Sequence, residues 1–443
     1  MMYKLIVPDF SKISDNRKIF LLEHAEEICS KYSLQKYLDE DYYPWEKLKY
    51  IEYPSELNNS EELYFIIQKL RTWNLTPVKT EKWKNFTINI PPFVQKLLHD
   101  LDSNSIEKLP WFSFSQFEKR SLSEEWIVEE AISSSQIEWA ATSSQIARIL
   151  IAKNKDPKNR DETMIMNNYK TMVYIRDDMK DLPLSEQLLL DLQKMITTNA
   201  LDDEWKAWRW RKDSDEIVVM SKLTWEVYHI PPSEKIMREE VKLLIDFAND
   251  KEESFIHPFI KATILHFWIS YLHPFCDWNW RSARAIFYRY LCKKWYNDFS
   301  YIPISRVIKK SKRQYENSFI YAEQESLDMT FFLVYIAKKT KQAFKEYREY
   351  ISEKKANNQR LQDVFQKLHS KELNERQMDL IGFFIENPEK FTNLSDYADQ
   401  YRITKNTAKS DLQWLEDAKL LRPKRSGKYI NYYPTQKLLD NFK

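Results

Sequence analysis

The segment that decides the fold and the chemistry of this chain is His273-Pro-Phe-Cys-Asp-Trp-Asn-Trp-Arg-Ser-Ala-Arg284. It places an imidazole, a carboxylate, an amide and two guanidinium groups directly after a strongly apolar stretch. Residues 256–272 are apolar nearly all round, which predicts a buried central helix. A second helix is expected to begin at the arginines of the segment. The polar groups would therefore lie in the connection between two helices.

This segment resembles the signature of the Fic family, His-x-Phe-x-(Asp/Glu)-Gly-Asn-Gly-Arg-x-x-Arg. The two family glycines are tryptophans here, Trp278 and Trp280. The resemblance implies a mainly α-helical, Fic-type bundle with a small β-hairpin flap. It also implies a protein that transfers AMP from ATP to a hydroxyl side chain of a target protein and releases pyrophosphate. The other defining positions match in residue and spacing: His273, Phe275, Asp277, Asn279, Arg281 and Arg284.

The resemblance assigns a role to each charged group of the signature. His273 would be the catalytic residue that deprotonates the target hydroxyl, which suits an imidazole near neutral pH. Asp277 would hold the Mg²⁺ that bridges the α- and β-phosphates, because a hard cation prefers oxygen ligands. Arg281 and Arg284 would neutralise charge on the β- and γ-phosphates.

The loop itself would bind phosphate through its main chain. Asn279 and the amides of Trp278 and Trp280 would cradle a phosphate group, while Phe275 would pack in the core and fix the loop. Such a nest needs positive φ angles and close approach of the backbone, which glycine allows and a side chain obstructs. A left-handed conformation costs a non-glycine residue roughly 1–2 kcal/mol. Taken literally, the two indoles predict poor nucleotide binding.

The composition offers a second explanation of these tryptophans. The chain has 2 glycines and 15 tryptophans in 443 residues, whereas ordinary usage of about 7% would give roughly 31 glycines. If the source organism reads the codon UGA as glycine, translation of UGA as tryptophan would print this pattern. The alternative is a degenerate relative that drifted at these sites. Tryptophan stands where a turn, a helix end or the family pattern calls for glycine at six positions: Trp139, Trp208, Trp225, Trp278, Trp280 and Trp295.

A second motif lies before the signature, in a helix expected near residues 130–145. Ser134-Ser-Gln-Ile-Glu138 resembles the family's inhibitory motif, in which the glutamate pairs with the second arginine of the signature. That pair, Glu138 with Arg284, would occupy the γ-phosphate subsite and hold ATP in a non-productive pose. Glutamate on a helix is otherwise usually a solvated residue. Some family members with this motif also remove AMP, so the direction of the reaction stays open.

Residues 216–230 alternate as two short strands around a turn, which predicts a hairpin. The resemblance identifies it as the flap, which binds an extended stretch of the target protein as an added strand. An ordinary edge hairpin is the equally open alternative. His229, which follows in this hairpin, is expected to be structural. Cys276, at a variable position of the signature, is expected to be a surface or packed thiol.

The chain is expected to contain four parts. Residues 1–115 form a mostly helical N-terminal region, and residues 116–350 form the Fic domain. A helix capped by Ser326 leads into a helical linker over residues 351–372. Residues 373–443 read as a winged helix-turn-helix, with Thr404 capping its third helix and Gly427 at the turn of its hairpin.

The last part carries a local excess of positive charge. Such modules bind DNA, but they also serve as protein-docking or dimerisation units, so a homodimer stays open. Asp411, Glu416 and Asp417 on the third helix count against DNA. The residues that could contact DNA phosphates are Lys405, Lys409, Arg422, Lys424, Arg425 and Lys428.

Other bounds come from charge and cysteine content. A net charge of +2 predicts no general attraction to nucleic acid or membranes. The three cysteines have no paired or metal-type spacing, which favours a reducing compartment. The apolar stretch before His273 is interrupted by polar residues, which argues against a membrane span. A cytoplasmic protein is therefore expected. Two functions therefore compete. One is an autoinhibited protein adenylyltransferase, and the other is a DNA-binding regulator with a catalytically dead Fic-type domain.

Overall fold

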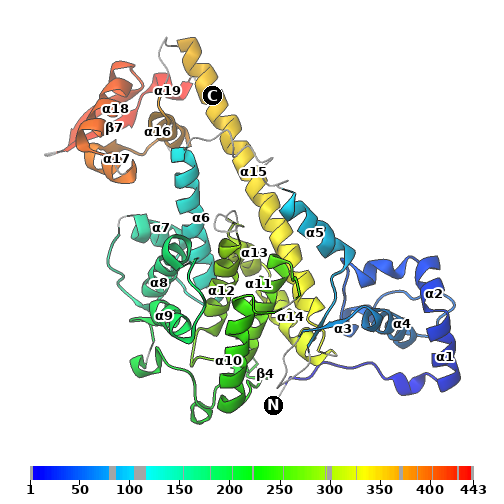
Figure 1. The fold of residues 1–443 in the computed structure, drawn as a ribbon. Helices are drawn as coiled ribbons and strands as arrows, with labels where there is room; N and C mark the ends of the chain where they lie inside the picture. Colours follow the sequence, from blue (N-terminus) through cyan, green and yellow to red (C-terminus); the bar gives the residue numbers. More distant parts are fainter. Residues whose placement is uncertain are drawn as a thin grey trace. The chain divides into compact units, whose positions relative to one another are not determined.

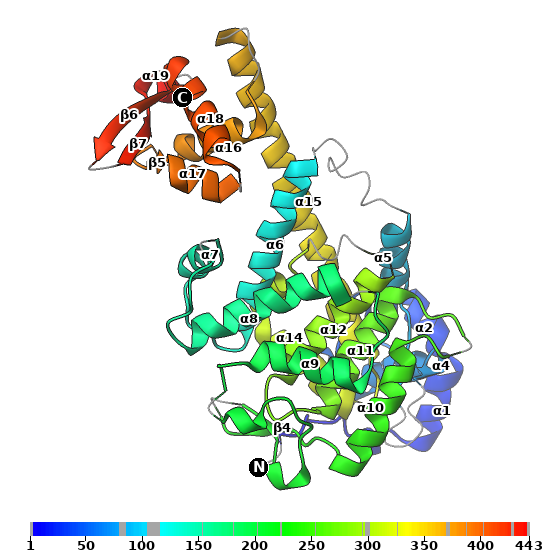
Figure 2. The same ribbon diagram turned by 60° about the vertical axis from the view of Figure 1, so that its left-hand side comes forward.

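The computed structural model describes residues 3–78, 86–103, 116–152, 154–179, 181–201, 203–221, 224–252, 254–294, 296, 302–325, 327–368, 373–386, 388–401, 403–426 and 429–440. Helices dominate this part of the chain, and the strands form small antiparallel sheets, which confirms the predicted mainly α class. The chain divides into two compact units (Figures 1 and 2). The first comprises Met1–Ile106, Leu122–Arg148 and Asp156–Lys345, and the second comprises Glu107–Ser121, Ile149–Lys155 and Glu346–Lys443.

The first unit contains most of the helices. Three helices, α6, α7 and α15, have residues in both units. The elements up to the end of α15 are α1 (Asp15–Glu23), α2 (Ala25–Lys31), α3 (Trp45–Leu48), α4 (Ser60–Trp73), β1 (Thr76–Pro77), β2 (Thr87–Ile88), α5 (Pro92–Asp102), α6 (Gln116–Ile137), α7 (Ser144–Ala152), α8 (Arg160–Tyr174), α9 (Glu186–Thr197), β3 (Val219–Met220), β4 (Val227–His229), α10 (Glu234–Ala248), α11 (Pro258–Leu272), α12 (Asn279–Lys293), α13 (Ile304–Lys309), α14 (Lys312–Gln324) and α15 (Thr330–Leu368).

Helix α11 is the centre of the first unit. Every residue from Phe259 to Leu272 is buried, because α10, α12 and α14 surround the helix in both views (Figures 1 and 2). Its aromatic side chains pack against those of α14 and α15, for example Phe267 against Phe319 at 5.4 Å and Phe332 at 5.5 Å between ring centroids. The apolar sequence of α11 is thus explained by burial on all sides.

The N-terminal region, expected to be mostly helical, packs α1–α4 around its own apolar cluster, which includes Leu21, Leu48, Leu63 and Ile67. Strands β1 and β2 pair antiparallel, with Thr76 opposite Ile88. A bridge between Thr87 and Asp328 ties this region to the segment before α15. These contacts place the N-terminal helices in the same unit as α11.

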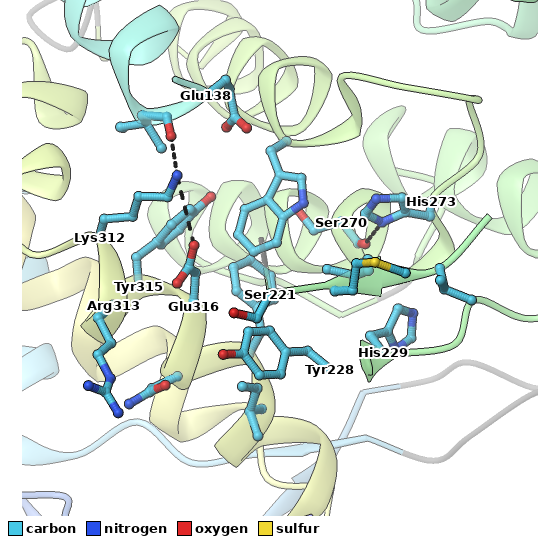
Figure 3. A pocket seen from close by; sticks show the side chains of 18 of the residues that line it. Glu138, Ser221, Tyr228, His229, Ser270, His273, Lys312, Arg313, Tyr315 and Glu316 are labelled. Atoms are coloured by element: carbon cyan, nitrogen blue, oxygen red, sulfur yellow. Dashed lines mark hydrogen bonds and ion pairs between the residues drawn. The ribbon is translucent and has the colours of Figure 1, made fainter. Parts of the chain in front are cut away.

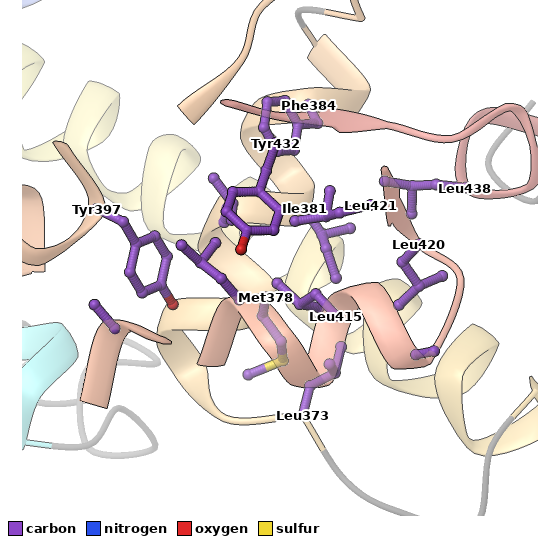
Figure 4. Close-up of a cluster of buried hydrophobic side chains, with 14 of the residues drawn as sticks. Leu373, Met378, Ile381, Phe384, Tyr397, Leu415, Leu420, Leu421, Tyr432 and Leu438 are labelled. Atoms are coloured by element: carbon purple, nitrogen blue, oxygen red, sulfur yellow. The ribbon is translucent and has the colours of Figure 1, made fainter. Parts of the chain in front are cut away.

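The second unit has a core of its own (Figure 4). Helices α16 (Glu375–Glu386), α17 (Leu394–Tyr401), α18 (Lys405–Asp417) and α19 (Gln436–Asp440) combine with β5 (Thr392–Asn393), β6 (Leu421–Ser426) and β7 (Tyr429–Pro434). The sheet has the order β5-β7-β6 and is antiparallel throughout. The core of the second unit includes four fully buried side chains, those of Ile381, Phe384, Leu412 and Leu415.

Several boundaries differ from the sequence predictions. Helix α6 starts earlier than expected and ends at Ile137, so Glu138 lies in the turn that follows it. Helix α12 begins at Asn279, two residues before the first arginine of the signature. Residues 351–368 of the expected helical linker are the continuation of α15, which runs unbroken from Thr330 to Leu368. Ser326, the predicted cap of that helix, lies outside the described residues.

Candidate active site

His273 stands at the C-terminal end of the buried helix α11. It has a left-handed conformation with φ 47°, and its main-chain N–H donates to the carbonyl of Ile269. Its Nδ1 lies 2.7 Å from the carbonyl oxygen of Ser270 (Figure 3). Because a carbonyl can only accept, Nδ1 carries the proton and Nε2 keeps its lone pair. Burial lowers the pKa of His273 to about 3, so the imidazole is a neutral base at physiological pH.

The loop after His273 is held by packing and by one amide side chain. Phe275 is buried and stacks on Trp210 at 5.2 Å between ring centroids, as predicted for a core residue. The side chain of Asn279 accepts from the main-chain N–H of Phe275 and donates to its carbonyl, both at 2.9 Å. Both polar atoms of Asn279 are therefore used inside the loop. Its side chain shapes the loop, and the predicted phosphate contact would have to come from main-chain amides.

Asp277 lies at the pocket surface, beside the N-terminus of α12. Its Oδ1 accepts from the main-chain N–H of Trp278 at 2.7 Å, and its own carbonyl accepts from Gln193 at 2.8 Å. Although the side chain reaches solvent, the recess around it desolvates the carboxyl and raises its pKa. Within the described residues no three acidic, histidine or cysteine side chains gather as a metal site. A single carboxylate that shares Mg²⁺ with substrate phosphates still fits, since Mg²⁺ is usually bound in this way.

Arg281 is the most unusual side chain of the site. It is 1% exposed, and within the described part of the chain none of its three guanidinium nitrogens has a hydrogen-bond partner. The indole of Trp278 lies over the guanidinium at 4.2 Å from its ring centroid. Burial without a partner lowers the pKa of Arg281 to about 10. A buried guanidinium covered only by an indole calls for an explanation, because buried charges are normally paired.

Arg284 has the partners that the resemblance implied. Its Nε donates to Ser134 Oγ at 2.8 Å, and its Nη2 donates to Glu138 Oε1 at 3.1 Å and to the carbonyl of Ser134 at 3.2 Å. The ion pair with Glu138 is largely buried on the arginine side. Nearby, Glu130 accepts from Tyr288 and Ser305, and its carboxyl has a raised pKa because it is fully desolvated.

A cavity of about 1170 Å³ is lined by His273, Asp277 and Glu138 among these residues. Figure 3 shows Glu138 at one end of the cavity, His273 and His229 on one side, and Lys312, Tyr315 and Glu316 of α14 on the other. Further lining comes from Asp277, Trp278, Trp280 and the strands β3 and β4. The cavity is large enough for a nucleotide-sized ligand.

The backbone separates the tryptophans into two groups. Trp139, Trp208, Trp225 and Trp278 have φ angles of 72°, 69°, 58° and 62°. No other described tryptophan has a positive φ. All four were predicted to stand at glycine positions. Trp280 lies in the first turn of α12 without a positive φ, so its assignment rests on the family pattern alone, and Trp295 lies outside the described residues.

The predicted hairpin is present as β3 and β4, with Val219 opposite His229 and an irregular register before Met220. Residues 222–223, at its turn, are not described. His229, which is expected to be structural, has a partner at each ring nitrogen. Its Nε2 lies 2.7 Å from the carbonyl of Tyr271, and its Nδ1 lies 2.8 Å from Glu323.

Two further residues of the site, Gln193 and Arg211, were not identified from the sequence. Gln193 on α9 donates to the carbonyl of Asp277 and accepts from Ser282 at 2.7 Å. Arg211 donates to main-chain carbonyls around His273. Arg211 belongs to the segment Lys206–Arg211 that also contains Trp208, so the glycine pattern at Trp208 could have drawn attention to it.

Cys276 is a packed thiol whose pKa is raised to about 11 by burial.

In the second unit, the predicted DNA contacts lie on α18 and on β6. Lys405, Lys409, Arg422, Lys424 and Arg425 are exposed, and Lys428 lies outside the described residues.

Asp411, which counted against DNA binding, is buried in the second unit. It accepts from Arg376 at 2.8 Å and from Asn374 at 2.7 Å. The exposed residues on the first turns of α18 are therefore basic or neutral: Lys405, Asn406, Lys409, Ser410 and Gln413.

The helical fold places a histidine at the end of α11 and two arginines at the start of α12, and helix N-termini are common places for anions to bind. Residues 183–291 match the model of the Fic/DOC family, which confirms the predicted resemblance over this part of the chain.

Individual proteins are similar to this chain in part of the sequence or in fold. A segment of 58 residues is 31% identical to Protein adenylyltransferase Fic of Nematostella vectensis. The match covers 13% of this chain and 14% of the length of that protein. The fold is similar to that of a Fic family protein from Desulfovibrio desulfuricans G20, with 16% identity, a TM-score of 0.50, and coverage of 79% of this chain and 97% of that one. A Fic domain containing signaling protein from Bacteroides thetaiotaomicron gives 17% identity, a TM-score of 0.47, and coverage of 58% and 97%.

No helix in the described part of the chain has the length and apolar character that crossing a membrane requires.

Proposed function

We propose that this protein is a protein adenylyltransferase of the Fic type. It would transfer AMP from ATP to a hydroxyl side chain of a target protein. The observation that carries the proposal is the buried, unpartnered guanidinium of Arg281, which lies against the indole of Trp278, and Trp278 lines the same cavity as the neutral imidazole of His273. Five N–H donors without a partner fit the oxygens of a phosphate group, which a guanidinium binds well. ATP is also the substrate that the name of the curated relative implies.

In the proposed reaction, the hydroxyl oxygen of the target attacks the α-phosphorus of ATP. His273 Nε2 takes the hydroxyl proton, because Nδ1 is already protonated and bonded to Ser270. The bond from the α-phosphorus to the bridging oxygen breaks, and pyrophosphate leaves with that electron pair. Arg281 and Arg284 would neutralise the charge on the leaving group. Asp277 would hold Mg²⁺, which neutralises phosphate charge when it is bound.

We further propose that Glu138 inhibits this reaction. The glutamate already neutralises Arg284 at 3.1 Å and lines the same cavity as His273. A γ-phosphate at Arg284 would have to displace this carboxylate or lie beside it, and two like charges repel at such short range. The ion pair therefore favours a pose of ATP in which the α-phosphate is not presented to the target.

This function requires the native chain to have glycine at 278. The positive φ of Trp278 supports that requirement, and so do the positive φ angles at 139, 208 and 225. With glycine at 278, the indole that covers Arg281 would be absent and the guanidinium would face the cavity. Drift to tryptophan at four left-handed positions has no physical advantage, because each costs roughly 1–2 kcal/mol.

The test uses two proteins, one with the printed sequence and one with glycine at the six positions. Each is incubated with ATP carrying ³²P at the α-phosphate, and transfer to protein is measured. We expect labelling only in the glycine protein, its increase on Glu138→Gly, and its loss on His273→Ala. If the glycine protein labels neither itself nor other proteins, with Glu138 intact or replaced, the adenylyltransferase proposal is wrong.

A second candidate function, DNA binding by the second unit, is favoured by one observation. The burial of Asp411 leaves an exposed face of α18 with Lys405 and Lys409 but no carboxylate in its first turns, and β6 adds further exposed basic residues. The order of elements α16, β5, α17, α18, β6 and β7 supports a winged helix-turn-helix. In such modules the third helix enters the major groove.

Binding of a labelled DNA duplex, followed by fluorescence anisotropy at several salt concentrations, tests this candidate. Replacement of Lys405 and Lys409 by glutamine should weaken binding and make the salt dependence less steep by about two phosphate contacts. Lys437, an exposed lysine on α19, is the matched control. Equal effects of the control and the double variant would contradict binding through α18.

A further inference from the structure

The C-terminal end of α11 is held by His273 of the signature and by His229 and Arg211 from outside it. The last carbonyls of a helix have no partner within it and need one elsewhere. Here the carbonyl of Ser270 accepts from the His273 ring, and that of Tyr271 accepts from His229. The carbonyls of Leu272 and His273 accept from Arg211. Figure 3 shows His229 and His273 on the same side of the cavity.

Arg211 contacts the main chain on both sides of His273. Its Nε donates to the carbonyl of His273 at 2.7 Å, and its Nη2 donates to the carbonyl of Leu272 at 3.2 Å and to that of Pro232. Its own main-chain N–H donates to the carbonyl of Pro274 at 2.9 Å. The side chain is buried. One residue thus binds three consecutive carbonyls, those of residues 272–274.

This arrangement matters because His273 has an unfavourable conformation. A φ of 47° is left-handed, and a non-glycine residue stays there only when its surroundings hold it. The planar guanidinium fits two neighbouring carbonyls at once, which an ammonium group cannot do in the same way. Its positive charge also suits the C-terminal end of a helix, where the dipole is negative.

We infer that Arg211 is a positioning residue for His273: it holds the turn of residues 272–274 so that the imidazole donates to Ser270 and presents Nε2 to the cavity. The inference rests on the proposed function for its kinetic consequence only. Burial lowers the pKa of Arg211, but nearby Asp213 counteracts this, in keeping with a charged side chain. The guanidinium of Arg211 binds main-chain carbonyls, so its proposed role does not involve contact with a substrate.

The neighbouring Arg209 is a matched control. It has the same side chain two residues earlier, in the same segment, but it pairs with Asp215, with both distances at 2.8 Å. Its side chain also donates to the carbonyl of Trp210 at 3.1 Å, and it makes no hydrogen bond to the described residues 272–274. Loss of Arg209 would therefore remove an ion pair without releasing the carbonyls around His273.

The experiment compares Arg211→Gln, Arg211→Lys and Arg209→Gln in the protein with glycine at the six positions. Three quantities are measured for each: kcat and KM for ATP in AMP transfer, the ¹⁵N chemical shifts of the His273 ring, and the unfolding temperature. We expect kcat to fall about tenfold or more in Arg211→Gln, with KM for ATP within about twofold. The kcat of Arg211→Lys should lie between that of Arg211→Gln and that of the parent. Arg209→Gln should leave kcat unchanged.

The ring shifts decide the inference independently of activity. The parent should show one tautomer with the proton on Nδ1, and Arg211→Gln should show shifts that move toward the average of the two tautomers. Unchanged shifts together with unchanged kcat in a folded Arg211→Gln protein would overturn the inference. If that variant does not fold, the shifts of Arg211→Lys decide in the same way. If the parent transfers no AMP at all, the proposed function fails, and the ring shifts alone judge Arg211.

Discussion

The backbone at Trp225 gives a prediction that does not depend on enzyme activity. Trp225 has φ 58° and is 73% exposed, whereas Trp205 is 64% exposed and has no positive φ. Replacing each residue by alanine and by glycine removes the same indole in both variants. The difference between the alanine and glycine variants at one site therefore isolates the backbone preference from the loss of the ring.

The size of that difference follows from two opposing quantities. At a left-handed position the Cβ of alanine costs roughly 1–2 kcal/mol, which glycine avoids. Glycine loses more chain entropy on folding, which costs it about 0.5–1 kcal/mol. At Trp225, the glycine variant should therefore be more stable than the alanine variant by up to about 1.5 kcal/mol. At Trp205 only the entropy remains, so alanine should be more stable by about 0.5–1 kcal/mol.

The assay is thermal unfolding of the four variants under one buffer condition, followed by circular dichroism. The account predicts opposite orders at the two sites, with glycine above alanine at 225 and alanine above glycine at 205. If alanine gives the higher unfolding temperature at both sites, position 225 does not need a left-handed residue. The argument that the backbone calls for glycine there would then be refuted.

Two other predictions concern the site, and a third concerns Glu325, which directly follows α14 and accepts from Tyr64 and from the main-chain N–H of Trp45. In the protein with glycine at 278 and 280, Glu138→Gly should raise labelling by ATP roughly tenfold or more, since loss of about 1.4 kcal/mol of competing interaction gives a factor of ten; unchanged labelling would argue against inhibition by Glu138. The same glycine protein should show a higher pKa for His273 than the value of about 3 in the printed sequence, because loss of two indoles opens the cavity to water; an NMR titration of the ring measures this, and equal titration curves would contradict it. Burial raises the pKa of Glu325 to about 7 in the folded protein, above its unfolded value of 4.5, so the folded state binds more protons and its stability falls as pH rises from about 4.5 through 7. The free energy of unfolding of Glu325→Gln, compared with that of the parent, should therefore rise by about 3 kcal/mol between pH 4 and pH 8. Unfolding of both proteins at both pH values measures this. A difference that does not change with pH would contradict the prediction.

Local sequence rules were sufficient where one physical effect dominated. The all-round apolar stretch before His273 could only be stabilised by burial, and α11 is buried on every side. Thr404 was recognised as a cap because its hydroxyl can accept an N–H of the first turn, and it accepts from Thr407 at 3.2 Å. The pairing of Glu138 with Arg284 was available only through the resemblance, since 146 positions separate the two residues.

Other features depended on tertiary contacts that spacing does not reveal. Asn279 was expected at a phosphate, but its two polar atoms bind the main chain of Phe275. Asp411 looked like a surface charge on a DNA-binding helix, but Arg376 of another helix neutralises it inside the unit. Arg211 could not be assigned because its partners are main-chain carbonyls far along the chain.

The central claim is that the loop between His273 and the two arginines can bring bare main chain close to a triphosphate. The mass of the proteolytic fragment that contains residues 278 and 280, taken from protein isolated from its own organism, tests this claim most directly. The account predicts the mass of glycine at both positions. The mass of tryptophan at both would contradict it and would leave the chain as a Fic-type scaffold without a nucleotide site.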